Sequence, residues 1–453
     1  MKRNIGLLLA LGCSYLPAVQ AQNPIDNYVS SPNTFTTVAD EKHGLSAPHD
    51  LDFVPGRPGE WWVLNKEEFG GSMVLFFNAG KSTQSHQFRR DSHNMHFMAR
   101  AVAMAFGDRD YFVTAQEIKN TESPSSTFMG PALWPSDTAI YARKHQNDWL
   151  PGELLGSHID MLHQSPFGMG VAYDHDNVYW YFDGFNGNIC KYDFAVPHGV
   201  GEDDHSDGRI HRYTDVKVKR VPDQPSHLAL DKVNNRLFIV DGGTKRVLVL
   251  HTATGKIAGD LKVPATADEP LAEYKEVTGA RQEVAVSSGL TAPCGIDYVK
   301  DRIIVSDYAT GNIHIYDVSV MPAKLVGTII TGGPGVMGVR IDKENRIWFV
   351  NNTTRKLMRV DNPKAMALPE NTLAEGTDFR IYPNPARERV FIELNITGAK
   401  AAVKVLDING RQMLEQVLQQ GQNTLDVSGW SQGVYQVVVS NERGSGTARF
   451  LVR

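Results

Sequence analysis

Hydrophobic and polar positions alternate most regularly between residues 225 and 250. In PSHLALDKVNNRLFIVDGGTKRVLVL, three runs with a period of two are separated by polar, turn-forming segments at residues 231–235 and 241–244. The three runs, 227–230, 236–240 and 246–250, are typical of half-buried β-strands and predict an antiparallel meander. One such meander cannot bury both of its faces, so it requires neighbouring copies of itself.

Five further copies of this unit occur along the chain. Their first and second strands are predicted at residues 48–53 and 60–65, 103–107 and 110–115, 169–174 and 178–183, 294–298 and 302–307, and 337–342 and 346–351. Six consecutive meanders predict an all-β fold, a six-bladed β-propeller over residues 33–361. Residues 33–38 are expected to supply the fourth strand of the last blade and to close the ring.

The repeated units resemble NHL repeats. The resemblance rests on a glycine followed by Ile or Val on the first strand, as in Gly170-Val171 and Gly295-Ile296, and on an Asp or Asn that ends the second strand. It also rests on fragments such as Ala309-Thr310-Gly311-Asn312-Ile313. The resemblance implies the propeller fold but no particular function, because such propellers serve as scaffolds, ligand binders and enzymes.

The first residues have the features of an export signal. Basic Lys2 and Arg3 precede an apolar run at residues 5–11, and small residues precede Ala21. This pattern predicts a signal peptide over residues 1–21. The alternative is a lipoprotein signal in which Cys13 carries the lipid.

The strand pattern is lost over residues 362–378, which we interpret as a linker, and returns over residues 379–453. Strands are predicted around residues 390–394, 402–406, 433–440 and 447–452, within a small β-sandwich of about seven strands. This segment resembles the C-terminal sorting domain of the type IX secretion system. The matching motifs are Tyr382-Pro383-Asn384-Pro385, Asp407-Ile408-Asn409-Gly410, Gly433-Val434-Tyr435 and Phe450-Leu451-Val452-Arg453.

This second resemblance implies a destination and a partner. The type IX machinery would carry the chain across two membranes, to the outer cell surface or into the medium. A net charge of -5 offers no basic surface for nucleic acid, and no apolar run of the mature chain is long enough to span a membrane. Besides Cys13 the chain has only Cys190 and Cys294, on predicted strands two blades apart, so we expect no disulfide between them.

The candidate chemistry gathers at one mouth of the central channel. In an antiparallel hairpin, the start of the first strand and the end of the second lie at the same end. The residues expected there are His49, Asn65, Met169, Asp183, His227, Asp241, Cys294, Asp307, Met337 and Asn351. His49, His227 and Cys294 are candidate ligands for zinc or copper, and the oxygens suit calcium. Alternatively, the Asp and Asn residues cap turns and the methionines pack the channel.

One strand at this mouth resembles an enzyme family. Pro48-His49-Asp50-Leu51 is similar to the zinc-ligand strand of peptidylglycine alpha-amidating lyase, also a six-bladed propeller. The resemblance implies zinc ligands at His49 and, in Pro293-Cys294-Gly295, at Cys294. In Pro225-Ser226-His227 the histidine is displaced by one residue, which reverses the direction of its side chain.

Two other clusters of polar residues stand out. Residues 198–211 concentrate histidines and carboxylates on the predicted connection between the third and fourth blades. This segment is either a divalent-cation site, formed by Asp203, Asp204 and Asp207, or a solvated acidic loop. The spacing of these residues does not fit an EF-hand. His86, His93 and His96 lie in the loop that enters the second blade, where a polar loop without a metal is the default.

The predicted function is binding outside the cell. We expect a secreted or cell-surface propeller with a divalent metal, zinc, copper or calcium, near the channel and a small-molecule, peptide or glycan ligand. The alternative is a metal-dependent lyase or hydrolase acting at the channel mouth. Long segments at residues 121–155 and 252–291 are expected to cover the mouth and shape a pocket, to which Trp134 and Trp149 contribute either ligand contacts or packing. The chain has no H-E-x-x-H, P-loop or CxxC motif.

Overall fold

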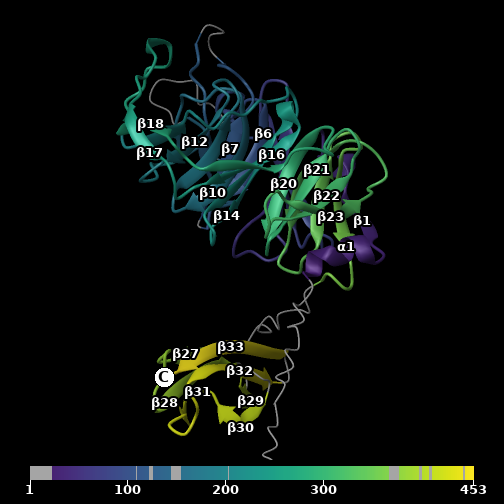
Figure 1. Cartoon of the computed structure of the whole chain (residues 1–453), viewed down its shortest axis with the longest axis vertical. Coiled ribbons are helices and arrows are strands. Elements are labelled where there is room, and N and C mark those ends of the chain that lie inside the picture. Colours follow the sequence, from purple (N-terminus) through teal and green to yellow (C-terminus); the bar gives the residue numbers. More distant parts are fainter. Residues whose placement is uncertain are drawn as a thin grey trace, which may run out of the picture. The chain divides into compact units, whose positions relative to one another are not determined.

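The computed structural model describes residues 23–453 except 109, 122–125, 144–154, 203, 367–376, 397–399, 408–410 and 442–443. The fold is all-β, and the chain divides into two compact units, one formed mainly by residues up to Ala365 and one by Met366–Arg453 (Figure 1). The predicted signal peptide and most of the predicted linker lie outside the described residues. Within the described ranges, no helix is long and apolar enough to cross a membrane.

The first unit is a propeller of six sheets, and each predicted pair of strands begins one of them (Figure 1). Blade 1 consists of β2 (Pro48–Phe53), β3 (Trp61–Lys66), β4 (Gly71–Phe77) and β5 (Ser85–Arg89). Blade 2 consists of β6 (Ala101–Phe106), β7 (Tyr111–Gln116), β8 (Ala132–Pro135) and β9 (Asp160–Met161). Blade 3 begins with β10 (Gly168–His175), β11 (Val178–Asp183), β12 (Asn188–Asp193) and β13 (Arg209–Tyr213).

The second half of the propeller repeats the same antiparallel plan. Blade 4 consists of β14 (Leu228–Asp231), β15 (Arg236–Asp241), β16 (Arg246–His251) and β19 (Gln282–Val286). Blade 5 consists of β20 (Pro293–Val299), β21 (Arg302–Asp307), β22 (Ile313–Asp317) and β23 (Lys324–Ile329). Blade 6 contains β24 (Val336–Ile341), β25 (Ile347–Asn351) and β26 (Lys356–Asp361). Short helices connect these strands: η2 (Glu41–His43), α2 (Asn94–Phe97), η3 (Gly242–Thr244) and η4 (Ala265–Ala267).

The N-terminal strand closes the ring, as the sequence predicts. β1 (Thr34–Ala39) pairs antiparallel with β26 and is the fourth strand of blade 6. The preceding η1 (Pro24–Asp26) and α1 (Asn27–Ser30) hold this end of the chain, and Tyr28 donates a hydrogen bond to the Val360 carbonyl at 3.0 Å. Asn362, in the predicted linker, is fully buried and hydrogen-bonds to Ser31.

One insertion changes the plan of blade 3. After β16, the chain leaves blade 4 and forms β17 (Lys256–Asp260) and β18 (Glu273–Thr278) before it returns as β19. β18 pairs in parallel with β13, and β17 pairs with β18, so blade 3 becomes a six-stranded sheet. Figure 1 shows this hairpin beyond β12. The insertion therefore carries residues of the fourth blade's sequence to the outer edge of the third.

The glycines of the inner strands allow neighbouring blades to approach each other closely. A Cβ atom on Gly295 would lie 2.1 Å from the Met337 carbonyl oxygen, and one on Gly170 would lie 2.1 Å from the Ser226 carbonyl oxygen. Both of these contacts are to the backbone, in β24 for Met337 and just before β14 for Ser226, and backbone cannot move aside as a flexible side chain can. The recurring glycine of the repeat is therefore required by the packing of one blade on the next.

Replacing Gly295 with alanine is expected to lower the free energy of unfolding by about 1–3 kcal/mol, the usual cost of overpacking a rigid core. Equilibrium denaturation in urea measures this loss. Gly259, on β17, has no atom within 4 Å of such a Cβ, so Gly259→Ala is the matched control and is expected to cost less than half as much. Equal losses in the two variants would contradict the explanation from interblade contact.

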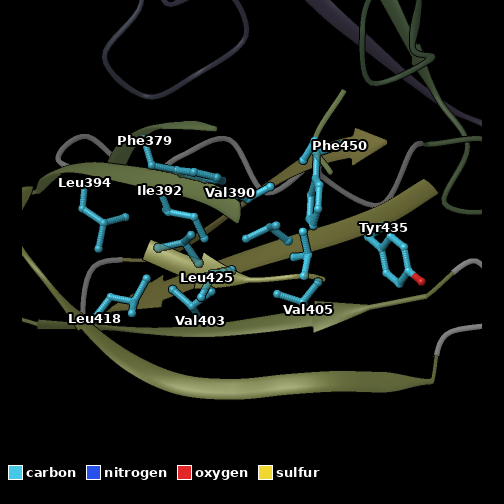
Figure 2. Packing of buried hydrophobic residues seen from close by; sticks show 14 of the residues in the cluster. Phe379, Val390, Ile392, Leu394, Val403, Val405, Leu418, Leu425, Tyr435 and Phe450 are labelled. Carbon is cyan, nitrogen blue, oxygen red and sulfur yellow. The ribbon is translucent and has the colours of Figure 1, made fainter. Parts of the chain in front are cut away.

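The second unit is a sandwich of two antiparallel sheets. One contains β27 (Thr377–Tyr382), β28 (Arg389–Ile396) and β31 (Gly421–Asp426). The other contains β30 (Gln412–Gln419), β29 (Lys400–Leu406), β32 (Gly433–Asn441) and β33 (Gly444–Val452). Apolar side chains from both sheets meet between them, among them Ile392, Val403 and Phe450 (Figure 2). The four strands predicted from the sequence are all present.

Candidate ligand-binding sites

The polar residues that end the second strands cap turns. Asn65 Oδ1 accepts a hydrogen bond from the Ser46 amide at 3.1 Å, and Asp241 Oδ1 accepts one from the Lys219 amide at 2.7 Å. Asp183, Asp307 and Asn351 likewise accept hydrogen bonds from nearby backbone amides. These bonds occupy the oxygens that a cation would need, so they favour the turn-capping alternative over a metal at the channel mouth.

The candidate soft ligands at the mouth are buried and have protein partners. His49 Nδ1 lies 2.8 Å from the Ala47 carbonyl oxygen, and Cys294 Sγ lies 3.3 Å from that of Val336. Burial lowers the pKa of His49 to about 4 and that of His227 to about 3, and it raises the pKa of Cys294 to about 12. Met169 and Met337 are buried in separate hydrophobic clusters. Both Cys190 and Cys294 are free thiols, as expected.

His49, His227 and Cys294 do not converge on one point. Two groups of three His, Cys, Asp or Glu side chains among the described residues have ligand atoms within 4.8 Å of one another, and neither includes these three. His227 instead faces Asp50, with 3.6 Å between His227 Nε2 and Asp50 Oδ2. The one-residue displacement of His227 in the sequence is one reason why His227 does not approach His49 and Cys294. It places His227 at the position where three other blades have glycine.

Ion pairs occupy the mouth instead. Lys66, which follows Asn65, lies 2.5 Å from Glu117 and 2.6 Å from Asp223, measured from Nζ to the nearest carboxylate oxygen. Arg100 and Arg220 pair with the same two carboxylates, with N–O distances of 2.7 and 2.8 Å. No motif in the sequence indicates this network, because its members come from the ends of strands and from the connection between blades 3 and 4.

A pocket lies over blade 2, on the side where its second strand ends. Its volume is about 420 Å³, and its walls are mostly apolar. The lining residues come from the connections that follow β3, β5, β7 and β9, together with loop segments before β8 and β9: Phe69, His93, Met95, His96, Phe97, Ile118, Asn120, Thr121, Phe128, Leu155 and His163. Phe69 and Met95 are 67% and 56% exposed, so apolar side chains at this pocket face solvent.

His163 is the best-oriented polar group of the pocket. Its Nδ1 lies 2.8 Å from Glu269 Oε2, and its backbone amide donates to the same carboxylate at 3.1 Å. The ring of Phe128 stacks on the imidazole with a centroid separation of 3.4 Å. His163 Nε2 is buried and has no hydrogen-bond partner among the described residues. The carboxylate thus fixes the orientation of the imidazole ring.

The long segments predicted to shape a pocket do so in part. Thr121, Phe128 and Leu155, from residues 121–155, line the pocket, and Glu269 comes from residues 252–291. The pocket, however, lies over blade 2 and includes none of the predicted mouth residues. Trp134 is fully buried in β8, which supports the packing alternative, and Trp149 lies outside the described residues.

The histidine cluster of the sequence is divided. His86 is exposed on β5, the fourth strand of blade 1, whereas His93 and His96 line the pocket. His96 Nδ1 lies 2.7 Å from Thr121 Oγ1. The pocket therefore contains three histidines, two of which the sequence had placed together on one loop.

The acidic cluster lies elsewhere than predicted. Residues 194–208 connect β12 to β13 within blade 3 and do not join blades 3 and 4. Asp207 is close to His198 and Asp160, which together form one of the two ligand groups. Asp204 is exposed and accepts a hydrogen bond from the Ser206 amide at 2.9 Å, and Asp203 lies outside the described residues. The other group consists of His163, His205 and Glu269. In it, the hydrogen bond between His163 and Glu269 already uses one atom of each of these two side chains.

Residues 380–453 match the family model of the secretion system C-terminal sorting domain. The C-terminal unit is a type IX sorting domain. The sorting domain confirms the prediction from the sequence: the chain is exported by the type IX secretion system and is secreted or displayed on the cell surface. This family model matches the sorting domain alone, so the resemblance of the propeller to NHL repeats stays a prediction.

Solved structures similar to the chain include propeller-like surface and binding proteins. PorZ, a surface component of the type-IX secretion system of Porphyromonas gingivalis, is 13% identical, with a TM-score of 0.38 over 90% of this chain and 59% of that one. An auxiliary nutrient binding protein from Bacteroides thetaiotaomicron is 11% identical, with a TM-score of 0.45 over 70% and 69%. Virginiamycin B lyase from Staphylococcus aureus is 10% identical, with a TM-score of 0.39 over 80% and 97%.

These likenesses carry no argument about ligand or reaction, because the identities and TM-scores are low. The chain spans 59% of the length of PorZ. No curated protein matches the chain.

Proposed function

We propose that the chain is an exported ligand-binding propeller whose ligand occupies the pocket over blade 2. The observation that carries the proposal is the combination of a largely apolar cavity of about 420 Å³ with one buried, oriented imidazole, that of His163. Small-molecule sites usually have this character, namely apolar walls and a few placed polar groups. The central channel is a weaker candidate, because ion pairs and capped turns occupy its mouth.

The lining restricts the class of ligand. Phe128 and Phe69 offer aromatic surface, and His163 offers a single hydrogen-bonding nitrogen next to it. A small molecule with a flat apolar body and one polar group fits these walls. A long glycan is disfavoured, because carbohydrate sites need many polar partners, and of the lining side chains only the three histidines, Asn120 and Thr121 are polar.

Binding of 1-anilinonaphthalene-8-sulfonate, an aromatic sulfonate, tests the pocket. We expect saturable fluorescence with about one dye per chain, and an affinity about two- to tenfold weaker in Phe69→Ala, since a lost aromatic contact costs about 0.5–1.5 kcal/mol. The matched control is Phe185→Ala, which removes a similarly exposed phenyl ring that is absent from the pocket lining. Equal effects of the two variants, or binding that does not saturate, would overturn the proposed site.

The second candidate is an enzyme that acts at the same pocket. The observation that favours it is the pair of His163 and Glu269, because a carboxylate that fixes an imidazole is a common arrangement for general-base catalysis. Turnover of a bound compound that His163→Gln abolishes, while the dye affinity stays within about threefold, would favour the enzyme over the binding protein.

A further inference from the structure

Three polar atoms converge where the outer edges of blades 2 and 3 meet. Asp160 begins β9, the last strand of blade 2, and His198 and Asp207 lie on the connection between β12 and β13. His198 Nε2 lies 3.4 Å from Asp207 Oδ1 and 3.8 Å from Asp160 Oδ2. These separations are longer than ordinary hydrogen bonds and fall within the distance of an ion pair.

None of the three atoms has a hydrogen-bond partner among the described residues. Asp160 Oδ2, His198 Nε2 and Asp207 Oδ1 are all buried from solvent. The side chain of Asp160 is fully buried, with 0% of its surface exposed. Leaving a buried polar atom unpaired costs at least about 1–3 kcal/mol, so two carboxylate oxygens and one imidazole nitrogen that face one point call for a common partner.

The second oxygen of each carboxylate orients the group. Asp160 Oδ1 lies 3.1 Å from His205 Nδ1, and Asp207 Oδ2 accepts a hydrogen bond from the Val196 amide at 3.1 Å. Each aspartate therefore uses one oxygen for its position and directs the other toward His198. Metal ligands are commonly held in this way by a second layer of hydrogen bonds.

The hairpin that carries two of the three groups is fixed to blade 2. The Gly201 amide donates to the His158 carbonyl at 2.8 Å, and the Leu155 amide donates to the Gly201 carbonyl at 2.9 Å. Because the backbones of the two blades are joined here, His198 and Asp207 keep their positions relative to Asp160. The site is thus preformed between two elements that are far apart in the sequence.

We propose that Asp160, His198 and Asp207 bind one divalent transition-metal ion of the zinc type. An imidazole and two carboxylates are ligands that zinc accepts, and ligand atoms 2.0–2.1 Å from a tetrahedral ion lie about 3.4 Å from one another. The separations of 3.4 and 3.8 Å fit this geometry. Calcium fits poorly, since it takes six to eight oxygens and only two carboxylates are present.

The ion would keep one open position. Three protein ligands leave the fourth tetrahedral site for water or a ligand. His198 also lines a cleft of about 660 Å³, together with Ile159 and Val200, which gives the ion a route from solvent. This inference goes beyond the proposed function, because none of the three ligands lines the pocket over blade 2.

Zinc titration of the full mature chain, stripped of metal with EDTA, tests the proposal. We expect about one zinc per chain by calorimetry and elemental analysis. Asp207→Asn and His198→Asn are each expected to weaken binding by about 100-fold or more, because loss of a hydrogen-bonding partner of a ligand alone costs 10–100-fold. Cobalt added in place of zinc is expected to give the absorption spectrum of a tetrahedral ion.

The matched control is Asp204→Asn, which removes an exposed carboxylate from the same hairpin. Asp204→Asn should leave the affinity for zinc within about twofold of the wild type. His163→Gln should do the same, which shows that zinc is not bound by the group that contains Glu269. Melting curves in EDTA check that the variants are folded. If one of the two ligand variants does not fold, the zinc affinity of the other is sufficient to test the proposal. Absence of zinc from the wild type, or equal affinities in all variants, would overturn the proposal.

Discussion

Replacing Arg212 with methionine is expected to lower the free energy of unfolding by about 3–5 kcal/mol. Arg212, on β13, is buried, and its guanidinium pairs with the fully buried carboxylate of Asp183. It also donates to Asn188 Oδ1 at 2.8 Å and to the Gln164 carbonyl at 2.6 Å. Methionine fills similar space but leaves the Asp183 charge without its partner in the interior. Equilibrium denaturation measures the loss.

Two controls separate the buried charge from other effects of the change. Arg209→Met removes an arginine of the same strand whose partner is Asp193, and 43% of the Arg209 side chain is exposed. Exposed ion pairs contribute about 0–1 kcal/mol, so this variant should be almost as stable as the wild type. Adding Asp183→Asn to Arg212→Met should restore part of the loss. A loss below about 1 kcal/mol in Arg212→Met would contradict the assignment.

The blades could be predicted because the residues that determine each blade lie close together in the sequence. The alternation of apolar and polar residues and the turn residues between them determine each meander within about 25 residues. The closing strand β1 could be predicted as well, because a ring with an open edge is unfavourable. The pairing of β18 with β13 could not, since alternation indicates a strand but not the sheet to which it belongs.

The candidate sites depend on contacts between distant parts of the chain. His163 and Glu269 are separated by 106 residues, and no motif connects them. In the proposed metal site, His198 and Asp207 belong to the cluster that the sequence revealed, whereas Asp160 lies 38 residues before His198, on another blade. Local clusters of polar residues therefore indicated a part of each site, and packing between blades supplied the remaining groups.

His49 illustrates the opposite case, in which the surroundings of a predicted metal ligand favour a structural role, although the metal prediction itself stays a prediction. The sequence favoured it as a metal ligand, but its side chain is buried and Nδ1 lies against the Ala47 carbonyl oxygen. Desolvation by burial is the main cause that lowers its pKa to about 4, and the nearby charge of Lys66 acts in the same direction. The folded chain thus holds His49 neutral at pH values where the unfolded chain protonates it.

The pH dependence of stability follows from this difference. Between pH 6.5, the ordinary pKa of histidine, and about 4, the unfolded chain binds a proton at His49 that the folded chain does not. The contribution of His49 to the free energy of unfolding is fully present above pH 6.5. It falls as the pH decreases toward 4, by up to about 3 kcal/mol in total. The buried Asp50 and Asp297, whose pKa values burial raises to about 6, act in the opposite direction. The informative quantity is therefore the difference between the wild type and a His49 variant.

His49→Asn is expected to remove this contribution, so that the variant loses less stability than the wild type between pH 6.5 and 4, by up to about 3 kcal/mol. Urea denaturation at several pH values measures the two slopes. His86→Asn is the control, because it makes the same substitution at an exposed histidine, on β5. Parallel profiles for His49→Asn and the wild type would show that the folded chain does not hold this imidazole neutral. A bound zinc ion that the wild type carries and His49→Asn lacks would instead support the metal prediction for the channel mouth.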